Sequence, residues 1–141
     1  MRFVICGSMD FARKMLEVGE YLTANGHTVL LPEQIEQDLA GSSVELLAQR
    51  KIKYDLIRKH WEKIRISDAI LVLNYEKDGT HGYIGGNTFL EMGFAHVLHI
   101  PIYTLYSLPQ SRYQPELIAM EPTILNGNLD ILTKHLCEVL P

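Results

Sequence analysis

A glycine-rich segment followed by a single acid is the part of this sequence best suited to chemistry. It runs from Asp78 to Ala95, with glycines at 79, 82, 85 and 86 and a carboxylate at Glu91. A backbone without side chains can approach a ligand closely, and a helix N-terminus there favours an anionic group. An ionised carboxylate beside a bound sugar could attack the anomeric carbon or stabilise an oxocarbenium ion. This segment is therefore predicted to form an active site in which Glu91 is catalytic.

The spacing of Thr88 and Glu91 has a second interpretation, a helix capping box in which Glu91 reaches back to the Thr88 backbone. A simple cap does not need several residues without side chains, so the glycines favour the catalytic interpretation. We predict that the helix opens at Thr88 and that Glu91 lies in its first turn, where the helix dipole keeps the carboxylate ionised. Four residues of this segment are predicted to bind substrate: Gly85, Gly86, Asn87 and Thr88.

Three further polar or glycine positions follow apolar runs that are typical of buried strands. Gly7 and Ser8 follow the run 2–6, and Asn74 follows the run 69–73. The Gly7-Ser8 backbone and the Ser8 hydroxyl could hold a phosphate or a sugar hydroxyl, and a tight turn with Ser8 as N-cap explains the pair equally well. Gly7, Ser8 and Asn74 are all predicted to contact substrate.

The histidines and cysteines give weaker signals. His60 lies one position from the apolar stripe of a predicted helix, where a core-edge histidine is the ordinary interpretation. Cys6 is expected to be a small buried residue, because no sequence neighbour would activate its thiol. No histidine has helical i, i+4 spacing to a downstream carboxylate, so no metal is expected. Two widely separated cysteines, at 6 and 137, indicate reduced thiols in a cytoplasmic protein.

The elements that must position these residues alternate along the chain. Apolar runs predict strands at 2–6, 28–31, 69–73, 100–105 and 122–125, and helical spacing predicts helices at 10–25, 42–66, 88–99 and 129–140. This alternation favours an α/β three-layer sandwich of the flavodoxin or Rossmann-like type, with a mostly parallel sheet of order 2-1-3-4-5. Ligands bind such sheets where the strand order reverses, which would bring Ser8, Asn74 and the glycine segment together.

Composition limits the class of protein. The 141 residues are 47% hydrophobic and 21% charged, which suits one globular domain over 1–141. A net charge of −4 without a basic tail argues against nucleic acid as a partner. No apolar run approaches the ~18 residues of a membrane span. One face of the predicted helix 42–66 is basic and expected to be solvated: Arg50, Lys51, Lys53, Arg58, Lys59 and Lys63.

Two segments resemble the nucleoside 2-deoxyribosyltransferase-like proteins, a superfamily that includes nucleotide N-glycosidases. The first is Val4-Ile5-Cys6-Gly7-Ser8. The second runs from residues 67–72 through 85–88 to Glu91-Met92-Gly93-Phe94-Ala95. The resemblance implies that Glu91 is the nucleophile that takes the deoxyribosyl group, and that the Gly-Ser pair and the glycine segment bind sugar or 5′-phosphate.

The sequence departs from this family at two carboxylates. An aspartate that the family carries eight residues before Asp68 is His60 here, and one that the transferases carry six residues before the nucleophile is Gly85. His60 could replace the first aspartate as a proton donor or hydroxyl ligand. The Gly-Gly-x-x-x-x-Glu spacing at 85–91 is also similar to that of phosphoribohydrolases.

The expected function is cleavage or transfer at the N-glycosidic bond of a nucleoside or nucleotide. Glu91 and His60 would be catalytic, with no cofactor. The resemblance further implies a homo-oligomer, for which the region 106–120 is a candidate contact. The alternative is a sensor that binds a nucleotide or NAD-like ligand without chemistry, because a fold alone does not distinguish the two.

Overall fold

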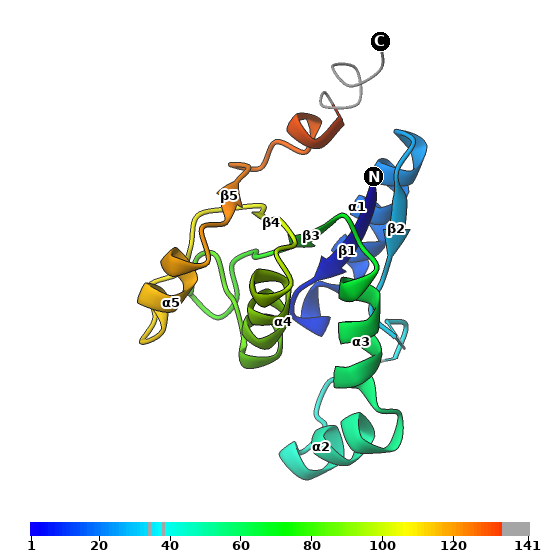
Figure 1. Cartoon of the computed structure of the whole chain (residues 1–141). Helices are drawn as coiled ribbons and strands as arrows, with labels where there is room; N and C mark the ends of the chain where they lie inside the picture. Colours follow the sequence, from blue (N-terminus) through cyan, green and yellow to red (C-terminus); the bar gives the residue numbers. More distant parts are fainter. Residues whose placement is uncertain (34, 38, 134–141) are drawn as a thin grey trace.

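The computed structural model describes residues 1–33, 35–37 and 39–133. Its centre is a parallel sheet of five strands in the order β2-β1-β3-β4-β5, so the predicted order 2-1-3-4-5 is confirmed (Figure 1). The strands are β1 (Arg2–Cys6), β2 (Thr28–Leu30), β3 (Ala69–Val72), β4 (Ile102–Thr104) and β5 (Thr123–Ile124).

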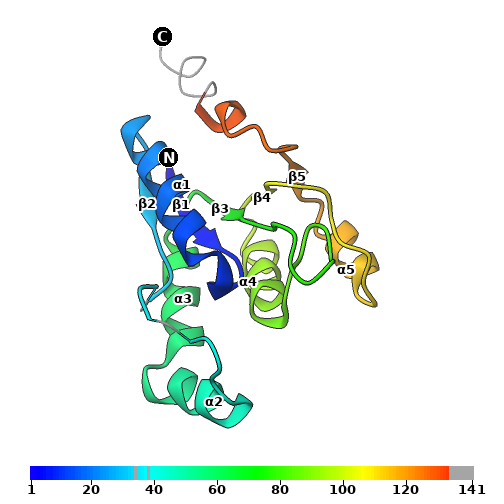
Figure 2. The same cartoon turned by 180° about the vertical axis from the view of Figure 1, so that it is seen from behind.

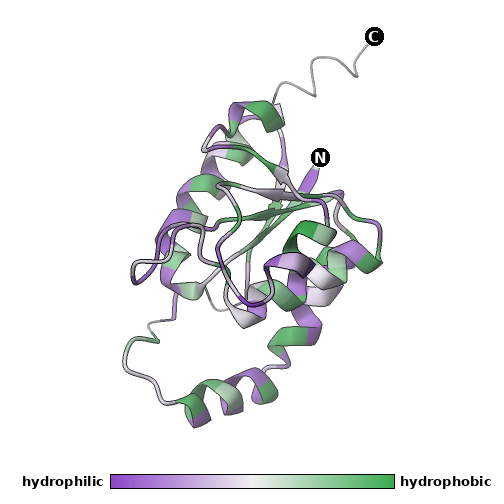
Figure 3. Ribbon diagram, turned by 90° about the vertical axis from the view of Figure 1, so that its left-hand side faces the viewer, coloured by the Kyte–Doolittle hydropathy of each residue, from purple (hydrophilic) through white to green (hydrophobic). Residues whose placement is uncertain are grey.

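Helices cover both faces of the sheet, as Figures 1 and 2 show from opposite sides. The helix α1 (Ala12–Ala24) follows a short turn, η1 (Met9–Phe11), and packs on one face. The other face is covered by α3 (Leu56–Arg65), α4 (Gly86–Val97) and α5 (Gln114–Ala119). The helix α2 (Val44–Lys53) has no buried residue and stands away from the sheet (Figures 1 and 3).

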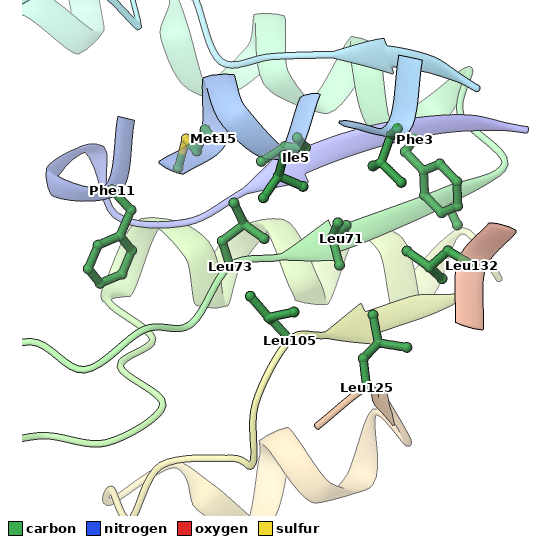
Figure 4. Close-up of a cluster of buried hydrophobic side chains, with 12 residues drawn as sticks. Phe3, Ile5, Phe11, Met15, Leu71, Leu73, Leu105, Leu125 and Leu132 are labelled. Atoms are coloured by element: carbon green, nitrogen blue, oxygen red, sulfur yellow. The ribbon is translucent and has the colours of Figure 1, made fainter. Parts of the chain in front are cut away.

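The strands form the core by alternating their side chains between the two faces. Phe3, Ile5 and Leu71 point towards α1, where they pack with Met15 and Leu22 (Figure 4). The intervening residues of the same strands point towards α3, α4 and α5: Val4, Cys6, Ile70 and Val72. The central strands β1 and β3 are therefore buried on both faces, as their continuous apolar runs predict, whereas both residues of the edge strand β5 are exposed.

The predicted single helix over 42–66 is wrong, because the chain breaks at Asp55. This residue adopts a left-handed conformation with φ 50°, which ends the run of helical hydrogen bonds after Tyr54. Arg58 holds the Asp55 carboxylate at 2.9 Å in the following turn. The N-cap of α2 is Ser43, whose hydroxyl accepts a hydrogen bond from the Leu46 N–H. The break turns α2 away from the direction of α3.

The last predicted helix, 129–140, is only partly described. Residues 130–133 are helical, and residues 134–140 lie outside the described part of the chain. The short α5 lies within the region 106–120. Within the described residues, no helix has both the length and the apolar character needed to cross a membrane.

Candidate active site

The glycine segment leaves β3 and returns to the sheet at the start of α4. Gly82 has φ +69°, and a Cβ at this position would lie 2.1 Å from the Ser107 carbonyl oxygen. Only glycine allows the segment to pass so close to the chain that follows β4. Tyr83 N–H donates to the Tyr75 carbonyl at 3.0 Å, which closes the loop at its base. These two contacts fix the position at which the chain enters α4.

The helix α4 begins at Gly86 with Gly85 as its N-cap, so the predicted start at Thr88 is wrong. Thr88 is buried inside the first turn, and Glu91 therefore lies in the second turn. A capping box and a dipole-stabilised first-turn carboxylate are both excluded by this register. A Cβ at Gly85 would lie 3.0 Å from the Tyr83 hydroxyl oxygen, whereas a Cβ at Gly86 would meet no atom within 4 Å, so only Gly85 is crowded at the start of this helix.

The Glu91 carboxylate is held instead by two side chains. Asn87 Nδ2 donates to Glu91 Oε1 at 2.6 Å from one turn earlier in α4. His60 Nε2, on α3, lies 3.0 Å from Glu91 Oε2. The exposed fraction of Glu91 is 6% and that of His60 is 5%, so this contact is almost fully buried. The sequence alone left the height of His60 along its helix open, and the packing of α3 against α4 places it beside Glu91.

Cys6 completes this group from the end of β1. Its Sγ lies 3.4 Å from His60 Nε2, and its side chain is fully buried. Three residues far apart in the sequence thus meet beneath the carboxyl ends of β1 and β3. Sequence spacing could not reveal this group, since the three residues come from three different elements.

Two adjoining cavities connect the group with the glycine segment. A cavity of about 50 Å³ is lined by Glu91, His60 and Asn87, among others. A larger cavity of about 280 Å³ is lined by six of the residues predicted to bind substrate: Gly7, Ser8, Gly85, Gly86, Asn87 and Thr88. Both cavities are also lined by Met9, Arg50 and Lys51. We call the two cavities together the crevice.

The crevice carries three cationic side chains that the sequence analysis did not assign to it. Arg50 and Lys51 reach it from α2, although the basic face of this segment was expected to be solvated. Within the described chain, Arg50 Nη2 is buried and has no hydrogen-bond partner. The positions of Arg50 and Lys51 depend on the break at Asp55, which no residue pattern around it predicts.

Lys77 is the third cation. Its Nζ lies 2.8 Å from Asp10 Oδ2 and 3.5 Å from Ser8 Oγ, at the edge of the larger cavity. The hydrogen bond to Asp10 raises the pKa of Lys77, so the ammonium group stays charged at neutral pH. Its position shortly after a strand end is a signal that the sequence analysis could have used, because ligands bind at the carboxyl ends of parallel strands.

Asn74 differs from the other predicted binding residues. It is fully buried, its Nδ2 donates to the Tyr106 and Ser107 carbonyls at 2.9 and 3.1 Å, and its Oδ1 accepts from Tyr106 N–H at 2.9 Å. It lines a separate cavity together with His81. Its polar groups tie β3 to the segment after β4, so the structure does not bring Asn74 into the crevice.

Replacing Asn74 by alanine is expected to lower the free energy of unfolding by about 2–4 kcal/mol, because buried backbone groups of Tyr106 and Ser107 lose their partner. Urea unfolding followed by circular dichroism measures this change. Ligand affinity of the folded variant should remain unchanged. A loss of ligand affinity without a loss of stability would contradict the tethering role.

The Cys6 thiol is expected to be inert at neutral pH. Burial, and then the negative charge of Glu91, raise its pKa well above the ordinary value of 9.0. The native state therefore holds the proton more tightly than the unfolded chain, and this contribution to stability is present below pH 9.0 and is lost as the pH rises through the native pKa. In a Cys137→Ser variant, a thiol reagent at pH 8 should react only after unfolding. Rapid reaction of the native protein would contradict this.

Comparison with known proteins identifies solved structures that share this fold. No protein-family model and no curated sequence matches this chain. The 2-deoxyribosyltransferase of the psychrotolerant bacterium Bacillus psychrosaccharolyticus superposes with a TM-score of 0.61 over 94% of this chain and 96% of its own, at 13% identity. A conserved protein from Enterococcus faecalis V583 superposes with a TM-score of 0.55 over 99% of both chains, at 14% identity. The three-layer α/β fold therefore matches that of a 2-deoxyribosyltransferase.

Proposed function

We propose that this protein cleaves or transfers the N-glycosidic bond of a nucleotide, with Glu91 as the nucleophile. The observation that carries this proposal is the placement of Glu91 Oε2. This buried carboxylate oxygen lies beside His60, and Glu91 lines a cavity that adjoins a glycine-lined cavity with cationic side chains. A fold that matches a 2-deoxyribosyltransferase supports the proposal.

The chemistry would proceed in two displacements at the anomeric carbon. Glu91 Oε2 attacks this carbon, the bond to the base nitrogen breaks with its electron pair, and the departing base takes a proton from water. The glycosyl group remains as an ester of Glu91. Water or a second base then attacks the same carbon, and Glu91 leaves as a carboxylate.

Two residues would keep Glu91 ready for this attack. Asn87 fixes Oε1 through its hydrogen bond, so Oε2 would be the oxygen that attacks the sugar. His60 Nε2 at 3.0 Å from Oε2 would act as the acid or base that exchanges a proton with the incoming water or with a sugar hydroxyl. In this role His60 replaces an aspartate that the resembled family carries at the same position.

The phosphate of the nucleotide would lie in the larger cavity. Free backbone N–H groups at the start of α4 favour an anion there, and the Gly85 and Gly86 positions leave them accessible. The unpartnered guanidinium nitrogen of Arg50 and the ammonium groups of Lys51 and Lys77 supply positive charge. This charge favours a nucleotide over an uncharged nucleoside.

Release of free base is the direct test. The protein is incubated with deoxynucleoside monophosphates, nucleosides and NAD, and free base is measured by chromatography. We expect free base to be released from a deoxynucleoside monophosphate, and the base to be exchanged when a second base is added. Tight binding of a nucleotide or NAD without base release would instead favour the alternative function, a non-catalytic sensor.

We further propose a homo-oligomer in which a second copy covers α2. This helix exposes large apolar side chains, with 78% of Val44 and 79% of Ile52 accessible. An apolar cavity of about 690 Å³ lies beside it, lined in part by Ile52, Trp61 and Phe94. These exposed residues favour α2 over the region 106–120 as the contact. Burying them would remove an apolar surface from water and fix α2, which carries Arg50, against the crevice.

The oligomer is tested by light scattering coupled to size-exclusion chromatography. The protein should elute as a homo-oligomer, and Ile52→Asp should shift it to a monomer, because a charge would be buried without a partner. Ile118→Asp, at an exposed position of α5, is the matched control and should keep the oligomer. A monomeric parent protein would contradict the proposal.

A further inference from the structure

The group formed by Cys6, His60 and Glu91 has a geometry that the glycosidic reaction does not require. One ligand atom from each residue, Sγ, Nε2 and a carboxylate oxygen, lies within 4.8 Å of the other two. Cys6 Sγ is 3.4 Å from His60 Nε2, and His60 Nε2 is 3.0 Å from Glu91 Oε2. The three atoms converge on one point, and β1, α3 and α4 hold them there.

A catalytic triad does not explain this convergence. In a triad the two ring nitrogens of histidine serve two different partners, so that one side receives a proton while the other is held. Here the same nitrogen, Nε2, faces both Cys6 and Glu91. It can carry only one proton, and it cannot connect the thiol to the carboxylate as a relay.

The Glu91 carboxylate also lacks one of its partners. Among the described residues no donor makes a well-aligned hydrogen bond to Oε2, although His60 Nε2 lies 3.0 Å away and the Cys6 thiol also approaches the carboxylate. Buried carboxylate oxygens are nearly always hydrogen-bonded or bound to a cation, because burying a charge without compensation is costly. An almost fully buried acceptor that points into a cluster of metal-ligating atoms indicates a cationic ligand.

We propose that Cys6, His60 and Glu91 bind one zinc-type divalent cation through Sγ, Nε2 and Oε2. Zinc prefers four ligands in a tetrahedron, at about 2.3 Å for sulfur and 2.0–2.2 Å for nitrogen and oxygen, which separates neighbouring ligand atoms by roughly 3.2–3.6 Å. The separations of 3.4 and 3.0 Å from His60 Nε2 are close to this range, and the third, between Cys6 Sγ and the Glu91 carboxylate, is no more than 4.8 Å and would close as the metal binds. The fourth position would face the cavity beside Asn87.

Charge and ligand type both support this class of metal. A thiolate and a carboxylate together neutralise a divalent cation, so the filled site carries no net charge in its buried position. A sulfur and an imidazole nitrogen select zinc, cobalt or copper over magnesium and calcium, which prefer oxygen ligands. Binding converts the Cys6 thiol to a thiolate and releases one proton, so the affinity should rise with pH.

The metal and the sugar would compete for Glu91. This consequence, unlike metal binding itself, rests on the proposed function, because Oε2 cannot hold the cation and attack the anomeric carbon at the same time. Zinc should therefore inhibit base release reversibly, and a chelator should restore it. Such a site would make the reaction sensitive to a thiophilic metal.

Cobalt(II) titration of the Cys137→Ser variant tests the site, because Cys6 is then the sole thiol. One equivalent should produce a thiolate-to-cobalt charge-transfer band and the intense visible bands of tetrahedral coordination, and zinc should displace them. Absence of the charge-transfer band would overturn the proposal without the need for any further variant. Cys6→Ala in the same background should abolish the band, and His81→Ala is the matched control that should retain it.

Activity measurements separate this proposal from the proposed function. In the presence of chelator, Cys6→Ala should release base like its parent, and it should lose inhibition by zinc. If cobalt binds at Cys6 but no substrate releases base, the glycosidic function fails and the metal site stands. Base release with full insensitivity to zinc, and with no cobalt band, would overturn the metal site alone.

Discussion

Replacing Glu91 by glutamine is expected to lower the rate of base release by at least about 10³-fold, as removal of a covalent nucleophile does. The substitution keeps the Oε1 acceptor for Asn87, so the crevice should retain its shape. Nucleotide affinity should therefore stay within a few-fold of the parent protein. Single-turnover kinetics and equilibrium binding separate these two effects.

Glu62→Gln is the matched control, since Glu62 lies on α3 but is half exposed and pairs with Arg65 at the surface. Its activity should equal that of the parent. Equal activity of Glu91→Gln and the parent would exclude Glu91 as the nucleophile. A parent protein that binds nucleotide but has no turnover to lose would leave the sensor as the better account.

Replacing Arg50 by methionine is expected to raise KM for a nucleoside monophosphate by about 10²-fold, because loss of one partner of a desolvated charge pair costs several kcal/mol. The buried Nη2 of Arg50 has no hydrogen-bond partner among the described residues, which leaves it for the phosphate. The corresponding nucleoside lacks this group, so its kcat/KM should hardly change. Steady-state kinetics with the two substrates measure the difference.

Arg13→Met removes a cation that pairs with Glu17 on the exposed surface of α1, and it should affect neither substrate. An equal loss for nucleotide and nucleoside in Arg50→Met would show that Arg50 supports α2 rather than a phosphate. The ratio of kcat/KM for the nucleotide to kcat/KM for the nucleoside therefore distinguishes phosphate binding by Arg50 from a structural role in α2.

The sheet order could be predicted because the alternation of apolar runs and helical patterns leaves few topologies for a parallel sheet. The parallel arrangement also predicts that Gly7, Ser8 and the residues 85–88 lie at one edge of the sheet, where the carboxyl ends of the strands meet. Asn74 also lies at this edge, since it follows β3. Its side-chain amide, however, hydrogen-bonds the backbone of Tyr106 and Ser107. The position of a residue at a strand end predicts which edge of the sheet it lies on. It does not predict which groups its side chain hydrogen-bonds.

The centre of the candidate site depends on packing between helices, which the sequence pattern does not encode. The contact of His60 with Glu91 requires the rotation and height of α3 against α4. The position of Arg50 requires the left-handed residue Asp55, which redirects α2. Aspartate tolerates this conformation, but most aspartates do not adopt it, so the break has no clear signature.

The proposed reaction must form a glycosyl ester on Glu91, and mass spectrometry can detect this intermediate. The protein is mixed with a deoxynucleoside monophosphate, quenched with acid within one turnover and digested with trypsin. The peptide 78–112 contains Glu91 as its sole glutamate, so its mass reports on this residue. This peptide should gain the mass of the deoxyribosyl phosphate in the parent protein, and the corresponding peptide of the Glu91→Gln variant should not. Base release with an unmodified peptide at every quench time would contradict it.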